Sequence, residues 1–379
     1  MTALTQFNDK AGLRFWGPVL PLLLLLLSGC DPDAGDDSVN FDRGAYLAHT
    51  ADNIIIPAYT DFLQKSFLLS ESLNAMTIGT IETQDIDAVR ESLHEAYTAW
   101  QHVQLFDFGP AISRALLVTT NTFPTDPMKI AEEALATSWT GGLPGNLDSS
   151  GLPALEWLFF ENDASTTAAT WNDQASGRLV HAQRLATFMT DEANAVLTNW
   201  IVEYRDQFVS STGTEAGSSM GELLNAFNRV YEGNIRKGKL GLPSGIMTFT
   251  QTPRPELVEA PHVAVWSVGF LMEGLKACAL VYYGDESNGA TDDLGLDDYL
   301  KSLGDVAYGE GLHNDIAAQL NSAETSIATM EDPLASFVVD QQAASFDVYA
   351  ELQALVVLWK VDMMSSLGVL ITYQDNDGD

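Results

Sequence analysis

The chain has 379 residues and a formal net charge of −34 at pH 7, with 52 acidic against 18 basic side chains. Such an acidic surface repels nucleic acid and anionic lipid headgroups, which excludes nucleic-acid-binding classes and favours cations as partners. General solubility or adaptation to a salty habitat explains the same charge without any specific ligand.

The first 29 residues have the pattern of a bacterial lipoprotein signal. Lys10 and Arg14 precede an apolar run over 15–27, shorter than the roughly 20 residues that a membrane span needs, and the run ends in Leu-Ser-Gly-Cys30. We therefore predict cleavage before Cys30 and lipid attachment to it, which anchors the protein in the cell envelope facing the periplasm. Residues 30–42 are rich in Asp, Gly and Ser and are predicted to be a flexible tether.

Cys278 is the second of the two cysteines. Since lipid would occupy Cys30, no intramolecular disulfide is expected, and Cys278 is interpreted as a small buried hydrophobic residue.

Apolar residues that recur every three or four positions predict helices throughout the remaining chain. No stretch shows the alternation and hairpin turns of strands, so we predict an all-α fold. A small-residue linker near 210–219 predicts two helical lobes, 43–210 and 211–379. The predicted helices span residues 43–76, 85–106, 128–138, 171–208, 220–231, 256–283, 294–303, 311–329 and 340–370.

A long turn-rich connection, 121–150, leads into the apolar stretch Gly151-Leu-Pro-Ala-Leu-Glu-Trp-Leu-Phe-Phe160. Pro153 at the first helical position would place Glu156 within the first turns, flanked by apolar side chains. A carboxylate there must be paired, hydrogen-bonded or uncharged. One interpretation is a helix-start acid satisfied by backbone amides. The other is a carboxylate that faces an internal polar site between helices.

The stretch Gly151-Leu-Pro153-Ala-Leu-Glu156 resembles the Gly-x-His-x-x-Glu motif of the imelysin family, in a lipoprotein subgroup where Gly-Leu-Pro-Ala-Leu-Glu is common. Pro153 stands where the motif has its histidine, so only Glu156 carries over. Further segments agree in order with the family: Trp100 with Phe108-Gly-Pro110, Phe123-Pro124, Lys239-Leu-Gly-Leu-Pro-Ser-Gly245 and Asp377-Gly-Asp379. The resemblance implies a two-lobed helical bundle, and the recurrence of Gly-Leu-Pro is consistent with an internal duplication.

The resemblance also implies a function. Imelysin-like proteins include components of iron acquisition, which indicates a binding module rather than an enzyme. The alternatives are a peptidase, the activity for which the family is named, and a non-catalytic scaffold for another envelope protein. The cofactor is unknown, with iron or another divalent metal as the candidate. If Glu156 belongs to a metal site, its co-ligands must come from elsewhere, and His94, His102 and Asp107 are the candidates.

Other catalytic patterns are incomplete. His94-Glu95 begins a zincin motif that lacks its second histidine, and the Gly-x-Ser-x-Gly at Gly217 follows a Ser/Gly linker rather than a strand. Glu-x-x-His occurs over 91–94 and 259–262, the spacing of di-iron bundles, although Pro261 disfavours a helix in the second. The basic cluster Arg236, Lys237 and Lys239 is expected to pair with carboxylates, and Glu156 is one candidate partner.

Overall fold

The structure is a computed structural model that describes residues 41–287, 289, 294–304 and 308–373. The predicted signal, the lipidation site Cys30, the tether up to residue 40 and the C-terminal Asp377-Gly-Asp379 lie outside these residues. The described residues belong to one compact unit.

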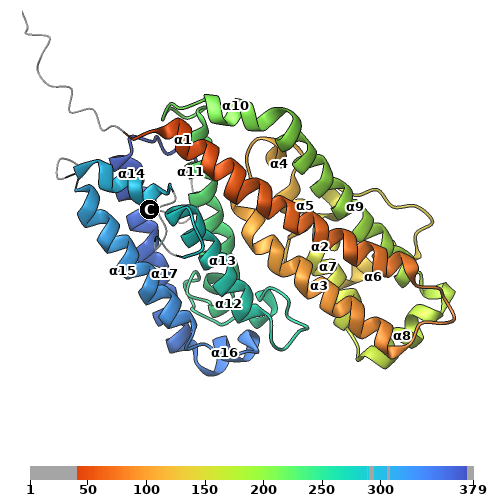
Figure 1. Cartoon of the computed structure of the whole chain (residues 1–379). Helices are drawn as coiled ribbons and strands as arrows, with labels where there is room; N and C mark the ends of the chain where they lie inside the picture. Colours follow the sequence, from red (N-terminus) through yellow and green to blue (C-terminus); the bar gives the residue numbers. More distant parts are fainter. Residues whose placement is uncertain (1–40, 288, 290–293, 305–307, 374–379) are drawn as a thin grey trace, which may run out of the picture. The chain divides into compact units, whose positions relative to one another are not determined.

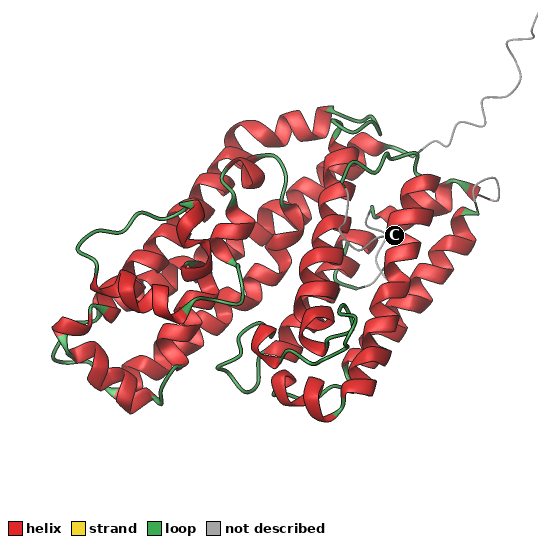
Figure 2. Ribbon diagram, turned by 180° about the vertical axis from the view of Figure 1, so that it is seen from behind, coloured by secondary structure: helices red, strands yellow, loops and turns green. Residues whose placement is uncertain are grey.

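The described residues contain helices and loops and no strand, which confirms the all-α prediction (Figure 2). In the first half of the chain the α-helices are α1 (Arg43–His49), α2 (Ile56–Ala75), α3 (Thr83–Val103), α4 (Pro110–Ser113), α5 (Leu116–Thr120), α6 (Pro127–Leu135), α7 (Gly151–Phe160), α8 (Ala164–Asn172), α9 (Arg178–Asn199) and α10 (Arg205–Ser210). In the second half they are α11 (Ser219–Val230), α12 (Leu242–Ser244), α13 (Ser267–Tyr283), α14 (Leu296–Ser302), α15 (Gly309–Ile327), α16 (Leu334–Asp340), α17 (Gln342–Val356) and α18 (Met364–Ser366).

Short helices of other types extend or link these elements. The π-helical segments are η1 (Thr50–Ile55), η5 (Trp200–Tyr204), η6 (Tyr231–Gly241) and η9 (Val357–Met363). The 3₁₀ turns are η2 (Gln104–Phe106), η3 (Pro144–Ser149), η4 (Gln174–Ser176) and η7 (Pro255–Leu257). Several of the predicted long helices are therefore divided into shorter segments of different helix type. The predicted helix 43–76 consists of α1, η1 and α2, and the wide π-helical turn of η1 lies directly before Pro57, which has no N–H to donate to the preceding turn.

Two groups of helices pack around a continuous hydrophobic core (Figure 1). In the first group α2 lies between α3 and α9, and α7 packs on α3 and α9. In the second, α15 packs on α17, α14 and α13. Helix α13 of the second group also contacts α3 of the first, so the two groups pack against each other. The lobe boundary near residue 210 stays a prediction.

The predicted helix over 256–283 is wrong in its first third. Residues 258–266 are irregular, and α13 begins only at Ser267. Pro261 cannot donate a helical hydrogen bond, and Ala260 before it has a left-handed φ of 54°, which no α-helix contains. The error matters because this irregular segment carries two residues of the candidate site.

None of the helices described here combines the length and apolar character that crossing a membrane requires.

Candidate functional site

Helix α7 places Glu156 in the interior. The helix begins at Gly151, whose φ of 71° and close approach to Thr120 leave no room for a side chain, since a Cβ would lie 2.1 Å from the Thr120 carbonyl oxygen. Pro153 is the third residue of the helix, where its missing N–H costs no hydrogen bond. Nearly every side chain of α7 is buried, and Glu156 is 1% exposed.

The partner of Glu156 is His262, 106 residues later in the chain. The main-chain N–H of His262 donates to Oε1 at 2.8 Å, and Nδ1 lies 3.0 Å from Oε2. Both carboxylate oxygens therefore accept hydrogen bonds from one residue. A backbone amide does satisfy Glu156, but it comes from a distant segment rather than from the start of α7.

The imidazole of His262 lies at the boundary between interior and solvent. Its side chain is 33% exposed, whereas that of Glu156 is 1% exposed. The hydrogen bond to Glu156 raises the pKa of His262 above its ordinary value, and partial burial opposes this. Because an ionised carboxylate only accepts hydrogen bonds, Nδ1 carries the proton in this pair.

The same irregular segment supplies Glu259, whose partner is Lys239 of η6. Both side chains are 1% exposed, and Lys239 Nζ donates to Glu259 Oε2. Burial lowers the pKa of Lys239, and the charge of Glu259 opposes this shift. The prediction that the basic cluster pairs with carboxylates is confirmed for Lys239, with Glu259 as the partner in place of Glu156.

A chain of hydrogen bonds connects this buried ion pair with the first group of helices. Asn121 Nδ2 donates to Glu259 Oε1 at 2.7 Å, and the Tyr97 hydroxyl donates to Asn121 Oδ1 at 2.9 Å. Burial raises the pKa of Tyr97, and the charges of Glu259 and Glu156 raise it further. Tyr97 thus lies within electrostatic reach of both carboxylates. A cavity of about 220 Å³ adjoins this chain and is lined by Asn121, Phe123 and Gly238 among others.

The turn of Ala260 allows Glu259 and His262 to serve different partners. The left-handed Ala260 redirects the backbone between them, and the Ser267 hydroxyl holds the carbonyl of Glu259 at 2.6 Å. A left-handed residue other than glycine costs roughly 1–2 kcal/mol, so the two ion pairs must hold this turn in place.

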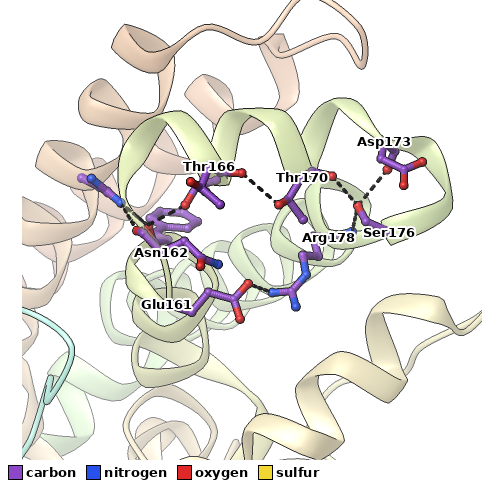
Figure 3. Close-up of polar contacts among 10 residues, drawn as sticks. Glu161, Asn162, Thr166, Thr170, Asp173, Ser176 and Arg178 are labelled. Carbon is purple, nitrogen blue, oxygen red and sulfur yellow. Dashed lines mark hydrogen bonds and ion pairs between the residues drawn. The ribbon is translucent and has the colours of Figure 1, made fainter.

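The far end of α7 is also anchored. Glu161 pairs with Arg178 of α9, and Figure 3 shows the two side chains facing each other beside the Thr166 to Ser176 segment. Arg90 donates to the carbonyl oxygens of Phe159 at 2.7 Å and Asn162 at 2.8 Å. Charge-assisted bonds of this kind limit movement of the helix that carries Glu156.

The four predicted metal ligands have four different partners. His94 packs against the rings of Trp266 and Phe270, at centroid distances of 4.8 and 5.9 Å. His102 Nε2 lies 3.1 Å from a Glu273 oxygen, and Asp107 Oδ2 accepts from Arg229 at 2.8 Å. Within the described ranges no group of three or more His, Cys, Asp or Glu residues is placed to hold a metal ion. Metal binding by Glu156, His94, His102 and Asp107 stays a prediction.

His262, Glu259, Lys239, Asn121 and Tyr97 were not among the predicted site residues. Two sequence signals pointed to three of them: the Glu-x-x-His spacing over 259–262, which matches the spacing of di-iron bundles, and the basic cluster that contains Lys239. Of the Glu-x-x-His pair, Glu259 is buried and His262 lies at the boundary with solvent, and each binds a protein partner.

Comparison with known sequences decides the family. The sequence model of imelysin matches residues 55–359 of the chain. The chain belongs to the imelysin family. A relative, the iron-regulated protein A of Synechococcus elongatus, is 25% identical over 250 residues, which cover 63% of this chain and 64% of that protein.

Solved structures share the fold. An imelysin-like protein from Psychrobacter arcticum superposes with a TM-score of 0.64 at 17% identity, covering 87% of this chain and 97% of its own. A candidate iron-regulated protein A precursor from Parabacteroides distasonis superposes with a TM-score of 0.66 at 15% identity, covering 89% and 97%. At these identities the likeness concerns the fold alone.

Proposed function

We propose that this imelysin-family protein is a lipid-anchored, periplasm-facing binding component of iron uptake or iron homeostasis, and not an enzyme. The observation that carries the proposal is the buried carboxylate of Glu156, which keeps its motif position and is held by two hydrogen bonds from His262. The iron-regulated name of a relative with 25% identity supports the link to iron. The lipid anchor rests on the sequence around Cys30.

The geometry suits cation binding better than peptide hydrolysis. A carboxylate that fixes Nδ1–H of an imidazole leaves a lone pair on Nε2, the arrangement found behind metal-ligating histidines. The same pair could act as a general base, but nucleophilic catalysis also needs a hydroxyl or thiol in contact with the imidazole. Among the described residues, the hydrogen bonds of His262 go to Glu156 only.

Two experiments test the proposal. Anaerobic calorimetric titration of the full-length protein with Fe²⁺ should give saturable binding, with Ca²⁺ and Mg²⁺ as comparison ions. No heat of binding with Fe²⁺ would refute the binding function. Turnover of an unfolded protein substrate such as casein, abolished by Glu156→Gln, would support the peptidase alternative instead. Association with a specific envelope protein without metal binding would support the scaffold alternative.

A further inference from the structure

A second cavity lies where the two groups of helices meet, and none of the residues that hold Glu156 lines it. Segments η1, α2 and α3 form one side, and the C-terminal end of α13 forms the other. Its volume is about 550 Å³, within the range of protein sites for small organic molecules, which often lie between packed helices. The cavity is therefore large enough for an organic ligand, and its lining defines which kind.

Carboxylates stand on both sides of this cavity. Asp61 lies on α2, and Asp285 and Glu286 follow the end of α13. Asp61 and Glu286 are exposed to solvent, whereas Asp285 is 8% exposed. The described residues of the lining include no lysine or arginine. A hollow walled by charges of one sign concentrates ions of the other sign, so this cavity attracts cationic ligands.

The end of α13 adds partial negative charge to the same wall. This helix has 17 residues and ends before Gly284, whose left-handed φ of 79° stops it. The last carbonyl groups of a helix carry the negative end of its dipole and favour cations. His49 Nε2 donates to the Gly284 carbonyl at 2.8 Å, and Asn53 Nδ2 lies 3.0 Å from His49 Nδ1. These bonds hold the end of α13 against η1, so the negative wall is preformed.

The basic side chains beside the cavity are paired with acids outside its lining. His102 of the lining lies 3.1 Å from Glu273, and Lys276 donates to the same carboxylate at 2.8 Å. These hydrogen bonds, the one with His102 first, lower the pKa of Glu273 to about 2. Lys65, one turn beyond the carboxylate on α2, donates to Glu95. A cation from solution therefore meets no lysine or arginine among the described lining residues.

Apolar side chains accompany these carboxylates. Ile54, Pro57 and Ala58 lie on the side of α2, and Leu280 lies on α13. A bare metal ion would make no use of such a surface, and within the described ranges no group of acids and histidines is placed to hold one. We propose that the cavity binds an aliphatic amine, with its ammonium group at the carboxylates and the end of α13 and its methylene groups on these apolar side chains. This site goes beyond the iron-linked function and does not depend on it.

Three probes matched in charge or in length test the ligand class by calorimetry on the full-length protein. Putrescine carries two ammonium groups on four methylenes, Mg²⁺ has the same charge without methylenes, and 1,4-butanediol has the methylenes without charge. We expect saturable binding of putrescine that neither equimolar Mg²⁺ nor equimolar butanediol displaces. Absence of saturable putrescine binding would refute the inference. Displacement by equimolar Mg²⁺ would also refute it, because general attraction to an acidic surface would then explain the binding.

Paired variants test the location. Asp61→Asn combined with Glu286→Gln removes the two exposed carboxylates of the lining. Glu71→Gln combined with Glu91→Gln removes two exposed carboxylates of α2 and α3 outside the lining, so both variants change the net charge equally. We expect the first variant to weaken putrescine binding at least tenfold and the second by less than about twofold. Equal weakening in both, or none in the first, would rule out the cavity as the site.

Methyl resonances give a readout that needs no variant. In protein with ¹³C-labelled isoleucine and leucine methyl groups, putrescine should shift Ile54 and Leu280, which line the cavity. Ile112, which is 55% exposed and outside the lining, should stay unchanged. Shifts confined to methyl groups outside the lining would place the amine elsewhere and overturn the inference. The Fe²⁺ isotherm tests the proposed function separately and is not affected by that result.

Discussion

The buried ion pair of Lys239 and Glu259 should be far more important for stability than its surface counterparts. Replacing Lys239 by methionine keeps most of the side-chain volume and leaves the carboxylate of Glu259, 1% exposed, without its cation. The Asn121 amide, at 2.7 Å, would still donate to that carboxylate, but no lysine would neutralise its charge. Removing one partner of a buried pair costs about 3–5 kcal/mol, because the remaining charge cannot return to water.

Urea unfolding followed by circular dichroism measures this cost, and two comparisons make it specific. The first is Lys65→Met, which breaks the pair with Glu95 whose side chains are 30% and 45% exposed, and which should cost at most about 1 kcal/mol. The second is the double variant Lys239→Met with Glu259→Gln, which removes both charges and should recover most of the loss. If Lys239→Met costs no more than Lys65→Met, or if the double variant is less stable than the single one, the reasoning about the buried pair is wrong.

Three further predictions concern pH and anchoring. Because the folded pKa of His262 is raised, the stability from its pair with Glu156 is fully present below about pH 6.5 and is lost as pH rises through the raised pKa. The stability difference between wild type and His262→Gln should therefore shrink from pH 6 to pH 9, and a constant difference would contradict the pairing. His181 is fully buried, 3.7 Å from Glu133, and burial lowers its pKa to about 4. The unfolded chain then binds the extra proton between about pH 6.5 and 4, so stability should fall by about 3 kcal/mol across that window as pH drops. In His181→Leu this fall should be absent during acid titration, and an unchanged acid transition would show that His181 does not control it. Finally, Cys30→Ser should yield released or unprocessed protein in cell fractionation, and a processed, membrane-bound variant would exclude lipidation at Cys30.

The sequence was sufficient for the helices because their evidence is local. The stripe Ile86, Val89, Leu93, Tyr97 and Trp100 steps by three or four residues, and all five side chains are at most 1% exposed in α3. Periodicity also suggested a helix over 256–266, where the apolar residues in fact line an irregular segment. There the local signals of Pro261 and the turn at Ala260 overrode the periodic pattern.

The candidate site could be predicted only in part, because its contacts are between distant segments. That Glu156 needs a partner follows from its apolar neighbours, since a lone buried charge is too costly. That the partner is His262 depends on how a loop 106 residues away packs against α7, which no local pattern encodes. The pairing of Lys239 with a carboxylate was expected from charge alone. The choice of Glu259 depends on the same loop.

The most direct test of the account is the Fe²⁺ isotherm of Glu156→Gln beside that of the wild-type protein. Glutamine keeps the shape of the side chain but offers one acceptor oxygen, so it cannot hold both the main-chain N–H and the Nδ1–H of His262. We expect Fe²⁺ binding to weaken at least tenfold, about 1.4 kcal/mol, with the helical circular dichroism spectrum unchanged. A folded Glu156→Gln protein that binds Fe²⁺ with wild-type affinity would contradict a binding site built on this carboxylate.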